Sequence, residues 1–223
     1  MHLNSDFTQK ALVKDQDNPW RASPSAGVER KMLDRIGDEV ARATTIVRFA
    51  PGSAFAPHTH DGGEEYIVLE GVFQDEEGDF PVGTYVRNPP TSHHTPSSKP
   101  GATIFVKLWQ FDPADRAHVR IDTNTVPTTS DPNRAGVETA TLFQDAQEHV
   151  RLDVWAAGVS HAFAAPDGAE ILVLDGSIAT TDANMTARDW LRLAPGSSMA
   201  LTAGPEGARL WVKTGHLRDI AKP

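Results

Sequence analysis

The feature that most constrains this chain is a succession of short β-branched and aromatic runs, each closed by Gly, Pro, Asp or Asn. No helical period of apolar residues stands out, and the pattern is typical of an all-β sandwich or barrel. We therefore expect an all-β fold. The predicted strands form two series, at 39–49, 65–73, 84–87 and 103–110, and then at 150–156, 170–178, 190–193 and 208–214.

The two series resemble each other in sequence. The string IVLEG at 67–71 and the string LVLDG at 172–176 both follow a glutamate, Glu65 and Glu170. IFVK likewise matches LWVK, and RFAPG resembles VWAAG, in the same order and at a nearly constant offset. Such an offset indicates an internal duplication, although all-β domains can share short strings by chance. Two tandem barrels are the expected architecture.

The second series starts after a stretch with a different composition. Residues 112–133 hold three prolines among many Thr, Ser and Asp residues, which is typical of a linker. We therefore divide the chain into a leader at 1–26, a first barrel at 27–115, a linker at 116–133 and a second barrel at 134–223.

Composition excludes several classes of protein. The chain has no cysteine, which removes disulfides, thiolate zinc sites, iron–sulfur clusters and cysteine nucleophiles. A net charge of −9 without a Lys/Arg stripe argues against nucleic-acid and membrane-surface partners. The first 20 residues lack the charged and then apolar pattern of a secretory signal, so we expect a cytoplasmic protein. Any metal site must use His, Asp, Glu or backbone oxygen.

A histidine cluster in the first series has the character of a metal site. His58 and His60 are two residues apart, so on a strand both side chains face one side. The turn-forming stretch at 61–63 can fold the chain back and bring Glu64 opposite them. His94 arrives from a separate segment. Three imidazoles and one carboxylate suit Zn, Fe, Mn, Ni or Cu.

The spacing of these residues resembles the two cupin motifs. The first motif, G-x5-H-x-H-x3-E-x6-G, is matched by Gly52, His58, His60, Glu64 and Gly71. The second, G-x5-P-x-G-x2-H, is matched by Gly83, Pro89 and His94. Thr91 replaces its second glycine and leaves the local turn geometry open. The spacing favours His94 over its neighbour His93 as the third imidazole.

A narrower resemblance extends from Gly27 to Trp109. The strings GVERKMLDR, EVARATTIVRFAPGS, HTHDGGEEYIVLEGVF, GTYVRNPP and IFVKLWQ resemble the cupin domain of ChrR-type anti-sigma factors. The resemblance implies a jelly-roll barrel with one divalent ion, zinc before Fe(II), Mn or Ni. It also implies that the ion is held by His58, His60, Glu64 and His94.

The same resemblance implies a regulatory function. A ChrR-type cupin senses a reactive small molecule and controls a sigma factor through a separate N-terminal zinc domain with a His/Cys motif. This chain has no cysteine and about 25 residues before the resemblance begins. We therefore expect a sensor or accessory role, with a small-molecule ligand and a sigma-factor-related partner, in a monomer or homodimer.

An enzyme is the alternative, because cupins similar to this one include non-haem dioxygenases of diketones, flavonols and aromatic ketones. Glu64 would then serve as ligand or general base. Tyr66, on the predicted metal-facing side of its strand, would donate a hydrogen bond to substrate, or it is a plain core residue. Arg87 would hold a substrate carboxylate, or it is an exposed arginine. In a third interpretation the metal only stabilises the barrel.

The second half lacks the metal site. Alignment on LVLDG places apolar residues at all four ligand positions, namely Phe163, Ala165, Ala169 and Ala200. His161 lies nearby without a partner at the required spacing and is predicted to be an ordinary polar residue. The acidic run at 75–79 in the first half is predicted to be a solvated hairpin tip.

Overall fold

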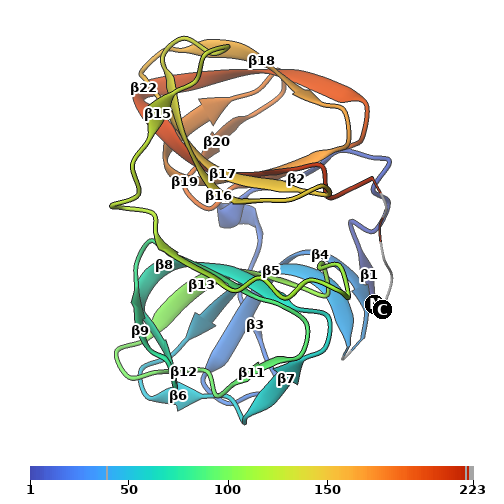
Figure 1. Cartoon of the computed structure of the whole chain (residues 1–223), viewed down its shortest axis with the longest axis vertical. Helices are drawn as coiled ribbons and strands as arrows, with labels where there is room; N and C mark the ends of the chain where they lie inside the picture. The colour runs from blue at the N-terminus through green and yellow to red at the C-terminus, as the bar shows by residue number, and fades with distance from the viewer. Residues whose placement is uncertain (39, 219, 221–223) are drawn as a thin grey trace. The chain divides into compact units, whose positions relative to one another are not determined.

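The computed structural model describes residues 1–38, 40–218 and 220, and Figure 1 shows its trace. The regular structure of these residues is β, apart from the 3-10 turn η1 (Asp15–Asp17), which confirms the predicted all-β class. None of the described residues forms a helix long and apolar enough to cross a membrane. Contacts divide the chain into unit 1, with Met1–Ser5 and Pro19–Thr125, and unit 2, with Asp6–Asn18 and Val126–Ile220.

Unit 1 is a cupin-type barrel built around a large antiparallel sheet. The sheet follows the order β1-β4-β5-β13-β8-β10-β14, while β7 pairs with β11 and β6 with β12. Its strands are β1 (His2–Leu3), β3 (Arg21–Ala22), β4 (Val28–Gly37), β5 (Ala41–Phe49), β6 (Ser53–Ala54), β7 (His58–His60), β8 (Glu64–Asp75), β9 (Gly78–Pro81), β10 (Thr84–Asn88), β11 (Ser92–His94), β12 (Ser97–Ser98), β13 (Ala102–Leu108) and β14 (Val119–Asp122).

Unit 2 repeats this plan. Its main sheet follows the order β15-β16-β17-β22-β19-β21-β2, and β18 and β20 pair with β22 and β19. Its strands are β2 (Ala11–Val13), β15 (Thr129–Ser130), β16 (Val137–Gln144), β17 (His149–Trp155), β18 (Ser160–Ala165), β19 (Ala169–Ala179), β20 (Asn184–Thr186), β21 (Trp190–Leu193) and β22 (Ser197–Thr214).

The strand register of the two units is the same at equivalent positions. In unit 1, Glu65 pairs with Lys107 on one side and Arg87 on the other. In unit 2, Glu170 pairs with a lysine on one side and an arginine on the other, Lys213 and Arg192. The side-chain contacts repeat as well, since the Tyr85 hydroxyl donates to Glu65 and the Trp190 indole donates to Glu170. The strand order and register of the two units confirm the prediction of two tandem barrels.

Each barrel buries its own apolar interior. Alternate residues of the central strands point inward, as the period of two requires. In unit 1 the inward cluster includes Val28, Phe49, Tyr66, Val68, Phe73, Phe80, Val86, Ala102, Ile104 and Val106. In unit 2 it includes Trp155, Phe163, Ile171, Val173, Leu191, Leu193, Leu201, Leu210 and Val212.

The eight predicted strands all correspond to observed ones, and seven of them differ at their ends by at most two residues. The eighth, predicted at 208–214, is longer, because β22 begins at Ser197. Glu39, the predicted start of the strand that becomes β5, lies outside the described residues. Strands β4 and β16 were not predicted. The segments interpreted as leader and linker contain β1, β2, β3, β14 and β15, and Asp6–Asn18 belongs to unit 2.

Candidate metal centre

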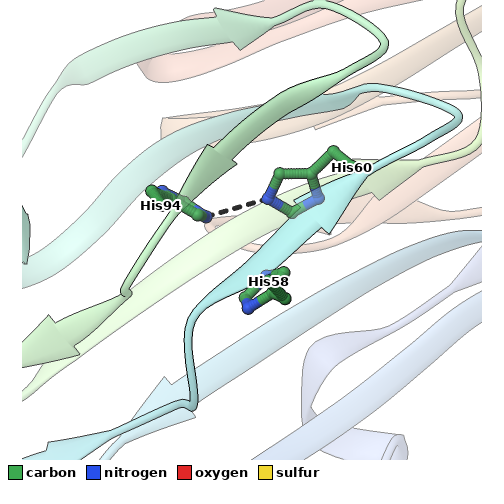
Figure 2. A group of neighbouring side chains, drawn as sticks. All are labelled: His58, His60 and His94. Carbon is green, nitrogen blue, oxygen red and sulfur yellow. Dashed lines mark hydrogen bonds between the residues drawn. The ribbon is translucent and has the colours of Figure 1, made fainter.

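Pairing between β7 and β11 brings three histidines together in unit 1. In the register of this pair, His58 lies opposite His94, and His60 lies opposite Ser92. The ligand atoms of the three imidazoles lie within 4.8 Å of one another. Figure 2 shows them converging from the two strands. The strand period thus places His58 and His60 near each other, and the pairing of β7 with β11 adds His94, so the three predicted imidazoles meet.

The separations between donor atoms fit a common cation. The Nε2 atoms of His60 and His94 are 2.9 Å apart. Glu64 Oε2 lies 3.4 Å from His60 Nε2 and 3.5 Å from His94 Nε2. Donors bound at about 2.1 Å to one ion lie roughly 3–3.4 Å from each other. The three-histidine cluster is therefore compatible with a divalent metal ion, with Glu64 beside it.

Hydrogen bonds at the far side of each ligand orient it. His58 Nδ1 lies 2.9 Å from the Ala56 carbonyl oxygen and donates to it, which leaves Nε2 with a free lone pair. His94 Nδ1 donates to Asp75 Oδ2 at 3.1 Å. Asn88 Nδ2 donates to Glu64 Oε2 at 3.2 Å. Such outer contacts fix the tautomer and ring orientation of metal-binding histidines.

Burial and charge set the protonation of the cluster. Burial lowers the pKa of His60, against the attraction of Glu64, so its ring is neutral and offers a lone pair. Burial alone would lower the pKa of His94 too, but the Asp75 hydrogen bond and the Glu64 charge outweigh it and raise that pKa.

The turn before β11 takes the conformation that the cupin motif gives to glycine. Thr91 has a φ of 77°, in the left-handed region, and its N–H donates to the His60 carbonyl at 3.0 Å. Gly196 takes the same place in unit 2, with a φ of 78° and the equivalent hydrogen bond to Ala165. Thr91 therefore keeps the turn geometry at a conformational cost.

A cavity of about 550 Å³ lies beside the cluster, inside unit 1. Its wall includes His58, His60 and Glu64, and most of the remainder is apolar. Trp109, whose φ is 58°, forms part of this wall. Its ring packs so closely on Gly62 that a Cβ there would lie 2.3 Å from a ring carbon. A small molecule in this cavity would reach the metal site.

Two weaker candidates have different outcomes. Tyr66 lies in the apolar core, 1% exposed, and its hydroxyl has no hydrogen-bond partner among the described residues. Burial and the charges of Glu64 and Asp75 raise the pKa of Tyr66 well above its usual value, so it is a neutral phenol. Arg87 is not an exposed arginine, since it is 1% exposed and forms an ion pair with Asp115 at 3.1 Å.

Asp75 is the residue that the sequence interpretation missed. Its side chain is 5% exposed and touches His94, whereas a solvated hairpin tip was predicted. The reason is a bulge in β8, where the register to β13 skips Leu69. An extra residue reverses the inward and outward alternation. Phe73 and Asp75 therefore point inward on the same strand as Glu64 and Tyr66.

Unit 2 has no ligand at the equivalent positions. Phe163, Ala165 and Ala169 belong to its apolar core. The predicted counterpart of His94, Ala200, is wrong by one residue: because Phe163 pairs with Met199 as His58 pairs with His94, the counterpart is Met199.

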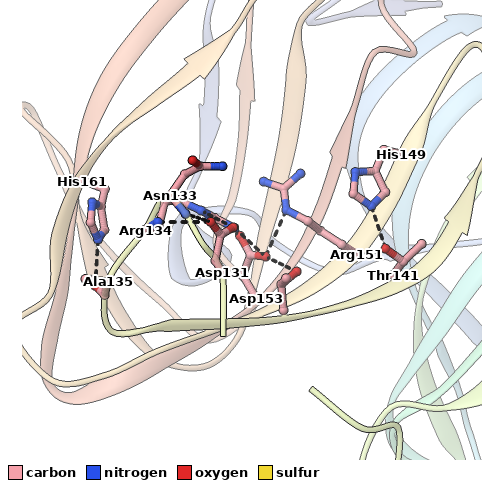
Figure 3. A network of polar contacts seen from close by, with 10 residues as sticks. Asp131, Asn133, Arg134, Ala135, Thr141, His149, Arg151, Asp153 and His161 are labelled. Carbon is pink, nitrogen blue, oxygen red and sulfur yellow. Dashed lines mark hydrogen bonds and ion pairs between the residues drawn. The ribbon is translucent and has the colours of Figure 1, made fainter. Parts of the chain in front are cut away.

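The interior of unit 2 also contains a buried ion network, drawn in Figure 3. Asp153 is fully buried and accepts two hydrogen bonds from Arg134, at 2.7 and 3.2 Å, and one from Arg151 at 3.0 Å. The Arg151 guanidinium lies over the Phe163 ring. His161 donates to the Ala135 carbonyl at 2.9 Å.

Comparison with known proteins agrees with the fold and with the ChrR-type resemblance. Residues 8–112 match the model of the ChrR Cupin-like domain family. Over 114 residues the chain is 27% identical to the acetylacetone-cleaving enzyme of Acinetobacter johnsonii, covering 49% of this chain and 74% of that protein.

Solved structures share the fold over nearly the whole chain. A candidate dioxygenase from Nostoc punctiforme superposes with a TM-score of 0.73 and 14% identity, covering 99% of this chain and 84% of that one. The pirin YhhW of Escherichia coli, solved with nickel(II), superposes with a TM-score of 0.67 and 14% identity, covering 93% and 99%.

Proposed function

We propose, from the premise that residues 8–112 are a ChrR cupin-like domain, that the chain binds one divalent metal ion and uses O2 to cleave a small 1,3-dicarbonyl compound. The observation that carries the proposal is the placement of the imidazoles of His58 and His60, with Glu64, on the wall of a cavity. A purely structural ion would have no use for that cavity. The similarity to an acetylacetone-cleaving enzyme supports the substrate class.

The ion would be held by His58, His60 and His94, with Glu64 as a fourth donor. When bound, a redox-active ion such as Fe(II) supplies Lewis acidity toward a dicarbonyl oxygen and the electron transfer that O2 chemistry requires. Zinc, Mn and Ni suit the same donors. Zinc would favour ligand binding without oxidation.

The residues of the chain supply the remaining functions. The apolar wall, with Phe55 and Trp109, would enclose the substrate and exclude water. Glu64 accepts a hydrogen bond from Asn88, and it would either stay a ligand or leave the ion to take the proton that the central carbon loses on enolisation. In the balanced reaction one bond between the central carbon and a carbonyl carbon breaks. One oxygen atom of O2 enters each product, a carboxylic acid and a 2-oxoaldehyde.

Metal binding is tested first, because everything else depends on it. Elemental analysis of the purified protein should give about one divalent ion per chain, and the double variant His58→Ala/His60→Ala should give almost none. The control variant His161→Ala, in unit 2, should keep the full amount. Wild-type metal content in the double variant would contradict the proposed site.

Cleavage is tested with protein reconstituted anaerobically with Fe(II). O2 uptake should follow addition of a 1,3-diketone, with a carboxylic acid and a 2-oxoaldehyde formed in equal amounts. The variant His60→Ala should show no uptake. Absence of uptake across diketones and aromatic ketones would refute the catalytic proposal.

Ligand sensing is the second candidate, and the ChrR family match at residues 8–112 is the observation that favours it. In that case the cavity would take a small molecule, zinc would be the resident ion, and a sigma-factor-related protein would be the partner. Pull-down with sigma factors at micromolar concentration tests this. No captured partner would count against it.

A further inference from the structure

The wall of the unit 1 cavity carries an excess of positive charge. As far as the described residues line it, the wall has two arginines, Arg30 and Arg35, and one carboxylate, Glu64, which belongs to the metal site. Arg35 is buried and donates to the backbone carbonyls of Gly37 and Asp38. At least two of the donor atoms of Arg35 are therefore engaged at the end of β4.

Arg30 is different. Arg30 lies on β4, two residues after Val28, and both side chains line the cavity. It pairs with Val47 on β5 and is half-buried. Within the part of the chain that the structure describes, its side chain makes no hydrogen bond, ion pair or ring contact. A guanidinium has five N–H donors and stays charged in proteins. Leaving it half-buried and unpaired costs free energy that an anionic ligand would recover.

Unit 2 has a different charge arrangement at the equivalent pair of positions. The register equivalents of Arg30 and Val47 are Thr139 and Asp153, which also pair across two strands. There the carboxylate of Asp153 takes the hydrogen bonds of Arg134 and Arg151. Unit 1 therefore has a cation, Arg30, where unit 2 has Thr139, and it has Val47 where unit 2 has the carboxylate of Asp153.

We propose that the cavity selects small dicarbonyl compounds that carry a separate carboxylate, with Arg30 as the residue that binds this carboxylate. A 2,4-dioxo acid has this chemistry: two oxygens for the metal and a carboxylate for the guanidinium fork. The inference rests on the proposed function, because it names the substrate class of the same site. It predicts preference for the acid over the uncharged diketone of similar size.

The test measures the binding of two small compounds to the full chain reconstituted with zinc, so that binding is measured without turnover. Calorimetry compares 2,4-dioxopentanoate with acetylacetone, which has a methyl group where the acid has a carboxylate. Wild type should bind the acid about tenfold or more tightly than acetylacetone. Arg30→Gln should lose this preference and keep its affinity for acetylacetone. Metal content and melting temperature, unchanged in the variant, show that fold and site are intact.

Two further variants define the charge effect. Arg21→Gln removes the exposed arginine paired with Arg30 on β3, and it should keep the wild-type preference. Val47→Asp places a carboxylate next to Arg30, where unit 2 has Asp153. This carboxylate would pair with Arg30, so the variant should lose the preference for the acid although Arg30 is still present. No preference in wild type, or a preserved preference in Arg30→Gln, would overturn the inference.

The readout separates this inference from the cleavage proposal. A preference for the acid in the zinc protein supports the role of Arg30 even if the Fe(II) protein takes up no O2. Uptake of O2 with acetylacetone, combined with no preference for the acid, would keep the cleavage proposal and refute the anion site.

Discussion

The two barrels share strand order and register, yet their equivalent positions carry a histidine cluster beside a cavity in unit 1, and apolar residues with a buried carboxylate in unit 2. In unit 1 the wall positions are His58, His60, Glu64 and Val47. In unit 2 the equivalent positions are Phe163, Ala165, Ala169 and Asp153, all of them buried. The two units therefore differ both at the candidate metal ligands and at a neighbouring position of the cavity wall, where Asp153 replaces Val47. Where unit 1 has candidate metal donors, unit 2 has buried apolar side chains and a carboxylate paired with Arg134 and Arg151.

The largest effect on stability should come from the ion network of unit 2. Burial alone would raise the pKa of Asp153, but the Arg151 charge and the Arg134 hydrogen bonds outweigh it and lower that pKa. Removing one partner of a buried pair leaves uncompensated charge. We expect Asp153→Asn to lower the free energy of unfolding at pH 7 by about 3 kcal/mol, measured by urea denaturation.

The pH dependence of that loss gives a second measurement. A carboxylate with a lowered folded-state pKa stabilises the fold above its unfolded pKa of about 3.9, and this contribution is lost as pH falls through the folded pKa. The difference between wild type and Asp153→Asn should therefore shrink in acid. The control Asp182→Asn, at an exposed partner of Lys10, should change stability little. Equal stability of Asp153→Asn and wild type at pH 7 would show that the buried ion network does not stabilise unit 2.

The second prediction concerns Asp75, which orients a ligand only in unit 1. We expect Asp75→Asn to lower zinc affinity about 10–100-fold, since the carboxylate no longer holds the His94 ring. Competition with a chromophoric chelator measures this. The matched control is Asp79→Asn in the same hairpin, where the carboxylate accepts from Gln74 instead. If both variants bind zinc as wild type does, Asp75 has no part in positioning the ligand.

The smallest effect concerns the turn before the third ligand. Thr91 and Gly196 have the same left-handed φ, which costs about 1–2 kcal/mol for a residue with a Cβ. Thr91→Gly should stabilise unit 1 by about 1 kcal/mol, and Gly196→Thr should destabilise unit 2 by about 1 kcal/mol. Calorimetric melting of both variants tests this. If Thr91→Gly lowered the melting temperature, the contacts of the Thr91 side chain would stabilise unit 1 by more than its left-handed φ destabilises it.

Local rules of the chain predicted most of the site. The HxH spacing and the turn at 61–63 act over a few residues, so the period of a strand was enough to place His58, His60 and Glu64 together. His94 comes from a distant segment, and only the resemblance to the second cupin motif identified it. Asp75 was missed because the bulge at Leu69 reverses the strand alternation. The partner of Arg87, Asp115, depends on a loop between strands whose path no short pattern encodes.

The one-residue error at Met199 has a similar cause. The sequence alignment of the two halves used the central strands, whereas the position of the third ligand depends on how β18 pairs with β22. Register between distant strands is set by tertiary packing. The buried ion network of unit 2 was likewise not predicted, because Arg134, Arg151 and Asp153 meet only after β16 and β17 have paired with their neighbours.

The strand β2 (Ala11–Val13) has a consequence for how the chain is made. It forms the edge of the unit 2 sheet, against β21 (Trp190–Leu193), although nearly all of unit 1 lies between the two in sequence. During synthesis, at about 5–20 residues per second, this strand waits on the order of 10–35 s before its neighbour exists. Until β21 is made, β2 has no strand to pair with. Once paired, β2 covers the edge of β21, which could otherwise pair with a strand of another chain. Unit 2 therefore completes its sheet only when the first and last thirds of the polypeptide are both present, so cutting the gene at the boundary between the barrels would separate a strand from its sheet.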